Sequence, residues 1–232
     1  MNRIRKQISD SKGFTIIELL IATLIFALIL ILITVSVLTF TKSYYRGVNQ
    51  SNTQNVARTV IENISQSIQF SGDLVNPVVT PNNGSQGFCV GNKLYSYALG
   101  WQLVEGTVST DLSQSPHALM LSAASSCNGA TAQDVRTANP DGTELLTPKM
   151  RLAKLKIEPM GGASVWRITV RVVFGDDDLL CSPSTQGSCQ SSNTMSPFGK
   201  EDLSCKVAFS GSQYCAMSEL STVVKKRVTS AQ

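Results

Sequence analysis

The sequence predicts an α+β protein in which one long N-terminal helix, transmembrane in its first half, packs on a C-terminal antiparallel β-sheet head. An apolar run covers residues 14–40 and contains a single charged residue. The apolar residues that follow recur at helical spacing, and beyond residue 72 turn residues separate short β-type runs. We therefore expect a leader at 1–13, a helix at 14–71 and a β-rich head at 72–232.

Most of the net positive charge comes from the first 13 residues. The chain has 20 Lys and Arg against 16 Asp and Glu, a formal net charge of +4. The leader holds Arg3, Arg5, Lys6, Lys12 and Asp10, so it carries +3 and the remaining chain carries +1. A near-neutral remainder has little capacity to capture phosphate, which disfavours nucleic acid as a partner. Basic flanks stay in the cytoplasm, so we expect the N-terminus inside and the head outside the inner membrane.

The run 14–40 is long enough to cross a bilayer as a helix, since about 20 apolar residues suffice. A cleaved secretory signal and a buried core helix are the alternatives. The apolar part of a signal is shorter and ends at a small-residue site, whereas this run continues past Thr34 and Ser36. Its one charge, Glu18, costs several kcal/mol at lipid depth unless it is partnered or near the interface. Glu18 therefore needs a functional reason.

The helix is expected to continue beyond the membrane. Between Lys42 and Ser71 there is no Pro, and the only Gly is Gly47. One stripe is apolar: Val56, Ala57, Val60, Ile61, Ile64 and Ile68. The opposite side is polar: Asn52, Gln54, Arg58, Glu62 and Gln66. This amphipathic pattern predicts that one face packs on a globular domain, and Ser71-Gly72 provides a stop.

The head is predicted to be built from short antiparallel strands. The strongest signal is a hairpin formed by 151–157 and Val165–Phe174, which alternate polar and apolar residues around a Gly-rich turn. In the second of these strands the apolar residues Trp166, Ile168, Val170 and Val172 are expected on the face opposite Arg167, Thr169 and Arg171. Weaker strand candidates are Phe88–Val90, Lys93–Leu99, Trp101–Val104, Ala118–Ser122 and Leu220–Val228.

All six cysteines follow the apolar run, at Cys89, Cys127, Cys181, Cys189, Cys205 and Cys215. An even number beyond a membrane-targeting segment favours disulfides in an oxidising compartment. Fifteen pairings are possible for six cysteines. Proximity in sequence favours Cys181 with Cys189 and Cys205 with Cys215, which leaves Cys89 with Cys127. Zinc is the alternative, but the chain has one His and no C-x-x-C spacing.

The most specific motif is Lys12-Gly13-Phe14-Thr15-Ile16-Ile17-Glu18-Leu19, which places a charged leader, a Gly and a carboxylate in order before a spanning helix. It resembles the N-terminus of the type IV pilin superfamily, which includes pilins and the pseudopilins of competence and type II secretion. The resemblance implies that a prepilin peptidase cuts Gly13–Phe14 and methylates the Phe14 amine. It also implies the lollipop fold of pilins, with assembly into a filament through Phe14, Glu18 and the N-terminal helix.

The second half of the helix, from Asn55 to Gly72, is similar to that of PilW-type minor pilins and J-type pseudopilins. Many major pilins have a proline where this chain has Val35, and a single disulfide loop where it has six cysteines. We therefore expect a minor subunit that either initiates assembly of a filament or forms its tip. The alternatives are a pseudopilin of a secretion or DNA-uptake system, and an adhesin or other ligand-binding tip. The expected partners are other pilin-like subunits, the prepilin peptidase and the inner membrane.

The remaining candidates are weaker. Asp176, Asp177 and Asp178 suit a calcium ion by charge, but they lack regular ligand spacing, and an acidic turn is the better interpretation. The basic run 225–227 fits a solvated strand edge better than a nucleic-acid site. No catalytic or phosphate-binding motif is present, so neither enzymatic activity nor a cofactor is expected.

Overall fold

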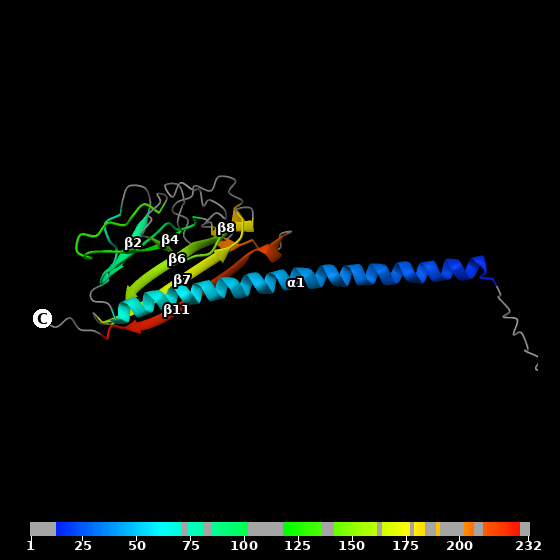
Figure 1. Ribbon diagram of the computed structural model, residues 1–232, viewed down its shortest axis with the longest axis horizontal. Helices are drawn as coiled ribbons and strands as arrows, with labels where there is room; N and C mark the ends of the chain where they lie inside the picture. Colours follow the sequence, from blue (N-terminus) through cyan, green and yellow to red (C-terminus); the bar gives the residue numbers. More distant parts are fainter. Residues whose placement is uncertain are drawn as a thin grey trace, which may run out of the picture. The chain divides into compact units, whose positions relative to one another are not determined.

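The computed structural model describes residues 13–70, 74–80, 85–101, 118–135, 142–161, 164–176, 179–183, 189–190, 202–206 and 211–227. One helix, α1 (Ile16–Phe70), is followed by antiparallel strands, which makes the fold α+β (Figure 1). The chain divides into two compact units, Met1–Tyr44 and Tyr45–Gln232. The second unit, which we call the head, contains the C-terminal part of α1 and all the strands.

In the described part of the chain the strands form three sheets. The largest joins β1 (Leu74–Val75), β2 (Gln86–Val90), β3 (Lys93–Tyr97), β4 (Leu119–Ala123) and β5 (Thr143–Glu144), in that order. The second has the order β11-β7-β6, from β6 (Met150–Pro159), β7 (Val165–Phe174) and β11 (Ala216–Lys225). A small third sheet joins β8 (Leu180–Pro183) to β9 (Cys189–Gln190) and β10 (Ser204–Cys205), and a short 3-10 helix, η3 (Ser212–Tyr214), precedes β11.

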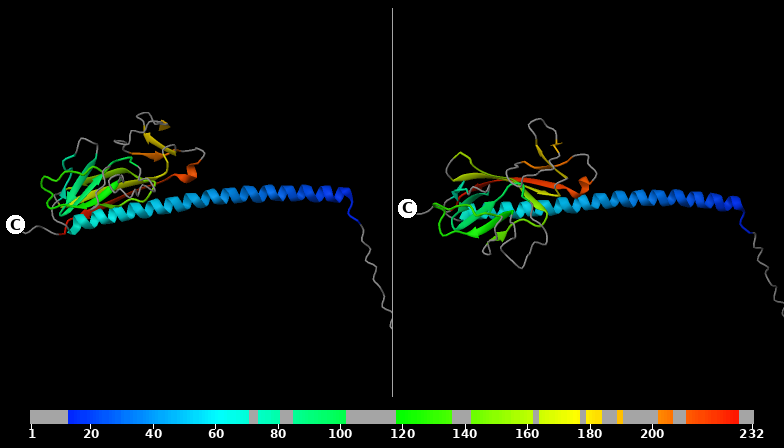
Figure 2. Two further views of the ribbon diagram at one scale, coloured as in Figure 1. Left: turned by 45° about the horizontal axis from the view of Figure 1, so that its top comes forward. Right: turned by 90° about the horizontal axis from the view of Figure 1, so that it is seen from above.

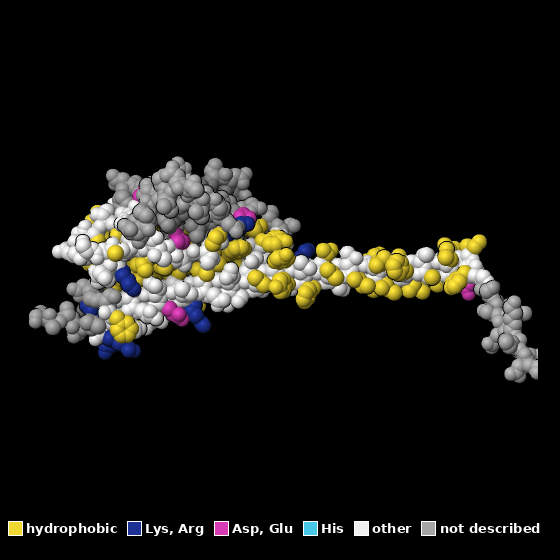
Figure 3. Space-filling model, in the orientation of Figure 1, with side chains coloured by type: hydrophobic (Ala, Val, Ile, Leu, Met, Phe, Trp, Pro, Cys, Tyr) yellow, Lys and Arg dark blue, Asp and Glu magenta, His cyan; other side chains and the backbone are white. Residues whose placement is uncertain are grey.

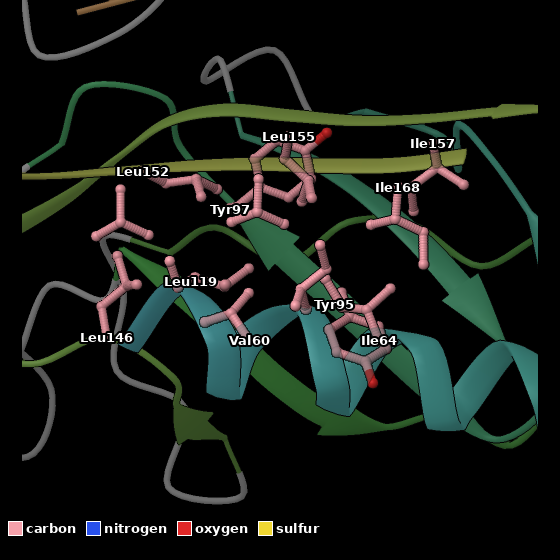
Figure 4. Packing of buried hydrophobic residues seen from close by; sticks show 14 of the residues in the cluster. Val60, Ile64, Tyr95, Tyr97, Leu119, Leu146, Leu152, Leu155, Ile157 and Ile168 are labelled. Carbon is pink, nitrogen blue, oxygen red and sulfur yellow. The ribbon is translucent and has the colours of Figure 1, made fainter. Parts of the chain in front are cut away.

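The predicted apolar stripe of α1 forms the centre of the core. Its six residues, Val56, Ala57, Val60, Ile61, Ile64 and Ile68, are all buried, while the polar residues on the opposite side are exposed. Figure 4 shows Val60 and Ile64 beside Tyr95, Tyr97 and Leu119 of the larger sheet, with residues of β6 and β7 above them. One helix face thus joins two sheets into a single core, because both sheets bury their apolar sides against it.

The predicted hairpin is present with the expected faces. β6 and β7 pair antiparallel along their length, and Ile168, Val170 and Val172 point into the core. The alternation follows from the two-residue period of a strand, which places successive side chains on opposite faces. A register shift between Leu152 and Lys154 marks a bulge in β6.

The last strand differs from the sequence prediction. We expected Leu220–Val228, but β11 begins at Ala216, four residues earlier, and ends at Lys225. The reason is tertiary, since β11 pairs with the whole of β7, from Ala216 opposite Phe174 to Lys225 opposite Val165. Figures 1 and 2 show β11 beside the C-terminal half of α1, and hydrogen bonds at both ends join them: Gln50 Nε2 to the Met217 carbonyl and Arg227 N–H to the Gln69 carbonyl.

The other strand candidates lie close to their predicted positions. β2, β3 and β4 overlap Phe88–Val90, Lys93–Leu99 and Ala118–Ser122. The candidate Trp101–Val104 is not supported at Trp101, which lies outside any strand and packs partly buried against the core. Its other three residues lie outside the described part of the chain.

A chain of polar contacts also holds α1 to the larger sheet. Tyr95, buried and stacked on Phe88 with ring centroids 4.5 Å apart, donates its hydroxyl to Asn63 Oδ1 of α1 at 2.7 Å. Its oxygen lies 2.8 Å from Ser67 Oγ, which in turn accepts from Lys93 Nζ at 3.2 Å. Burial raises the pKa of Tyr95, and the hydrogen bond from Ser67 lowers it by less. The neutral phenol is therefore the form that the folded head favours.

We predict a pH-dependent contribution of Tyr95 to stability. Tyr95→Phe keeps the ring stack but removes the hydroxyl, and it should cost about 1–2 kcal/mol of unfolding free energy near neutral pH. Because the folded pKa lies above the unfolded value of 10.0, this contribution is complete below about pH 10 and declines as the pH rises further. Chemical unfolding of the full chain in detergent, followed by tryptophan fluorescence, measures the difference. If the difference in unfolding free energy between wild type and Tyr95→Phe stays constant as the pH rises above about 10, the prediction is contradicted.

Candidate functional site

The expected cleavage site lies in non-helical backbone. Gly13, Phe14 and Thr15 precede α1, and the Phe14 side chain is 82% exposed. A Cβ added to Gly13 would meet nothing within 4 Å, so packing within the described chain gives no reason for a glycine there. A requirement for glycine would then come from the enzyme that recognises the site. Gly13 and Phe14 are both exposed, so the bond between them is accessible.

Thr15 and Glu18 form a reciprocal cap on the first turn of α1. The Thr15 N–H and hydroxyl both donate to Glu18 Oε2, at 2.9 Å and 2.8 Å, and the Glu18 N–H donates to Thr15 Oγ1 at 3.3 Å. This is a capping box, in which the residue before the helix and the third residue of the helix satisfy each other's backbone donors. The negative carboxylate also lies at the positive end of the helix dipole.

Thr15 is a residue of this site that the sequence prediction missed. The prediction rests on the charge of Glu18 in an apolar run and gives Thr15 no role of its own. The spacing T-x-x-E before an apolar run is itself the signature of a capping box, so the signal was present in the sequence. The structure shows that the Glu18 carboxylate is oriented by Thr15, one turn from the expected new N-terminus.

The cap leaves one carboxylate oxygen available. Both Thr15 donors converge on Oε2, and within the described residues Oε1 of Glu18 accepts no hydrogen bond. A carboxylate has about four acceptor positions on its two oxygens, so the cap uses only part of its capacity. Glu18 can therefore remain capped and still accept a cation, such as an amine, on its other oxygen.

The helix beyond the cap presents an apolar surface on all sides. Every large hydrophobic residue from Ile16 to Phe40 is exposed (Figure 3), and the smallest exposed fraction among them is 47%, for Leu30. An 18-residue stretch of α1 has a mean hydropathy of 3.1. Such a surface requires lipid or other apolar helices around it. The hydroxyl groups in this segment donate to carbonyls of the preceding turn, as Thr34 does to Leu30 and Ser36 does to Leu32. Their polarity is thus satisfied within the helix, which suits an apolar surrounding.

The cysteines lie in the head. Cys89 is bonded to Cys127, and Cys205 to Cys215, as proximity in the sequence suggested. Cys181 is disulfide-bonded as well, and the side chain of its expected partner, Cys189, lies outside the described residues. The first bridge ties β2 to the segment after β4, and the second ties β10 to Cys215, the residue before β11.

The weak calcium candidate is only partly within the described chain. Asp176 is exposed, whereas Asp177 and Asp178 lie outside the described residues. Among the side chains that the structure describes, no group of three or more His, Cys, Asp or Glu could hold a metal ion.

Comparison with known proteins identifies the same N-terminal segment. Residues 8–34 match the family model described as the prokaryotic N-terminal methylation motif. The match includes Gly13, Phe14, Thr15, Glu18 and most of the apolar run. No curated protein and no solved structure matches the chain.

We predict that Thr15→Ala loosens the first turn of α1. Loss of a Thr cap costs about 1 kcal/mol, which corresponds to roughly fivefold faster hydrogen exchange of the Glu18 amide. Thr15→Ser keeps the hydroxyl and should exchange at the wild-type rate. NMR exchange on the full chain in micelles measures both. Equal exchange rates in Thr15→Ala and wild type would show that the cap does not hold this turn.

The methylation motif, the capped apolar helix and the α+β fold together indicate that the chain is similar to type IV pilin-like precursors, structural subunits that a prepilin peptidase processes before assembly.

Proposed function

We propose that the chain is a minor subunit, priming or tip, of a type IV pilus-like filament, with a leader at 1–13, a helix at 14–71 and the β-rich part of the head at 72–232. The observation that carries the proposal is the junction at the start of α1. An accessible Gly13–Phe14 bond is followed within one helical turn by a capped carboxylate and then by an exposed apolar helix. These parts are needed for processing, docking and packing, respectively.

In this proposal Glu18 docks the amine of a neighbouring subunit. Cleavage creates an α-amine on Phe14, and a subunit displaced along a helical stack brings that amine to the Glu18 of its neighbour. Oε2 is held by Thr15, and Oε1 accepts the amine. Burying Glu18 without a partner would leave an uncompensated charge among apolar helices, at a cost of roughly 3–5 kcal/mol. The pair therefore selects one register of assembly.

Before assembly the helix spans the inner membrane once, with the basic leader in the cytoplasm and the head outside. The charge difference across the span supports this orientation. The disulfides of the head agree with it, because they form and persist in oxidising compartments outside the cytoplasm.

Two features support a minor rather than a major subunit. α1 is one unbroken helix through Val35, where many major pilins carry a proline. The head has disulfides in two separate regions, Cys89–Cys127 and Cys205–Cys215, in addition to the bonded Cys181. A head of short strands and polar loops gains order from such bridges.

The processing step has a direct test. Co-expression with a prepilin peptidase should yield a chain that begins at Phe14 with a methylated amine, as read by intact mass and N-terminal peptide mass spectrometry. Gly13→Val should leave the chain uncut, because the peptidase is expected to require glycine at this position. The variant should still fold, because a Cβ added at Gly13 would meet nothing within 4 Å. A wild-type chain that still starts at Met1 in the presence of active peptidase would contradict the assignment.

The docking step can be separated from the cap. Glu18→Gln keeps an acceptor for the Thr15 donors but removes the charge, whereas Thr15→Ala removes the cap and keeps the charge. We expect Glu18→Gln and Glu18→Ala to insert into membranes normally but to be lost from sheared filaments. Thr15→Ala should be incorporated.

Membrane fractionation and immunoblotting of sheared filaments, in cells that supply the other subunits, measure both quantities. A matched control is Thr23→Ala, which removes a hydroxyl from the same run and should leave incorporation unchanged. Normal incorporation of Glu18→Gln would refute the role of the charge.

A further inference from the structure

An exposed apolar patch lies at the end of the head where α1 begins in this unit. We call it the collar; it consists of Tyr45 and Val48 of α1, Tyr214 of η3 and Met217 of β11, which are 37–47% exposed. Figure 3 shows hydrophobic side chains gathered at this end of the head. Four large apolar side chains left open to water at one place mark a surface for an apolar partner.

The collar is held together by direct contacts. The rings of Tyr45 and Tyr214 meet with centroids 5.8 Å apart. Asn49 Nδ2 donates to the Gln213 carbonyl at 3.3 Å, and Gln50 Nε2 donates to the Met217 carbonyl at 3.0 Å. The segment 213–217 is therefore pinned to the same two turns of α1 that carry Tyr45 and Val48, so these side chains share one level along the helix.

The length of α1 between Ile16 and Tyr45 can be compared with the thickness of a bilayer. At 1.5 Å per residue, Tyr45 lies about 44 Å along α1 from Ile16, while a bilayer with its headgroups is about 40–45 Å thick. A tilt of about 20° shortens this rise to about 41 Å. If the apolar run spans the membrane from its first turn, Tyr45 emerges in the headgroup layer on the far side, and Tyr214 and Met217 lie at the same depth.

The chemistry of the collar suits the headgroup layer better than bulk water or hydrocarbon. Tyrosine has an apolar ring and a polar hydroxyl, and it is enriched where membranes meet water. Between Glu18 and Glu62 the sequence has no acidic residue, and Lys42, Arg46 and Arg58 are its only charges there. Glu219, the nearest acidic residue along β11, is paired with Arg171 and Lys154. The charges around the collar thus favour lipid phosphate.

We propose that the collar rests in the phospholipid headgroup layer and sets the height of the head on the membrane while the subunit waits for assembly. This inference rests on the proposed function, since it requires α1 to span the bilayer. Extraction into a filament would then have to remove the collar from lipid as well as the apolar helix.

The test is photocrosslinking of the full chain in membranes of cells that express no other filament subunit. The photoreactive residue p-benzoylphenylalanine replaces Tyr214 or Met217, or replaces Val223 as the control. Val223 is 55% exposed on the same strand, six residues beyond Met217 or about 20 Å along β11. Because β11 runs from Gln50 toward Gln69 beside α1, that displacement leads away from the membrane.

After illumination, phospholipid adducts are measured by mass spectrometry and protein adducts by gel. We expect several-fold more phospholipid adduct at Tyr214 and Met217 than at Val223. Lipid adducts no higher than at Val223, or adducts to protein alone, would overturn the proposal. An intact Cys205–Cys215 bond, shown by alkylation without reduction, establishes that each variant is folded.

A fourth position separates this inference from the proposed function. The same photoreactive residue at Leu30, within the apolar run, should give phospholipid adducts if α1 spans the membrane. Adducts at Leu30 without adducts at the collar would refute the collar alone. Absence of adducts at Leu30 would refute both the membrane anchor and the inference that depends on it.

Discussion

The head depends on one interaction, the packing of a single stripe of α1 between two sheets. Val60 and Ile64, both fully buried, contact the larger sheet through Tyr95 and Leu119 and belong to the same core as Ile168 of β7. Because the stripe must stay aligned over several turns, the helix cannot kink within the head, and its axis there is defined by the sheets.

The same helix meets two different surroundings along its length, and its sequence changes accordingly. Within 16–40 its surface is apolar on all sides and its hydroxyls are bonded to carbonyls of their own helix. Within 52–68 one stripe is apolar and buried, and the opposite side is polar and exposed. Because the helix is continuous through both parts, its interior N–H and C=O groups are hydrogen-bonded to one another. A helix in lipid requires this, and an interruption of the helix would leave some of these groups without partners. The collar begins where the first pattern gives way to the second.

The start of the helix combines a structural and a functional requirement in two residues. Thr15 and Glu18 satisfy each other's backbone N–H groups, which are two of the donors that the first turn of a helix leaves without a partner in the helix itself. The cap also fixes the direction of the carboxylate, and among the described residues it leaves one of the two oxygens for a second partner. Substitutions that preserve either the cap or the charge, but not both, are therefore the informative ones at this site.

The sequence by itself determined the features that depend on local pattern: the apolar run, the buried stripe from Val56 to Ile68, the β6–β7 hairpin and the isolated charge of Glu18. These follow from sequence periods of 3.6 and 2 residues and from a charge in an apolar run. All of these are local patterns that do not depend on contacts with distant segments. Only the tertiary structure decided the start of β11 at Ala216, since pairing along β7 selected it, and the assembly of the collar from segments 45–48 and 214–217. The contact between these two segments cannot be predicted from sequence periodicity, because each segment contributes only two residues to the collar.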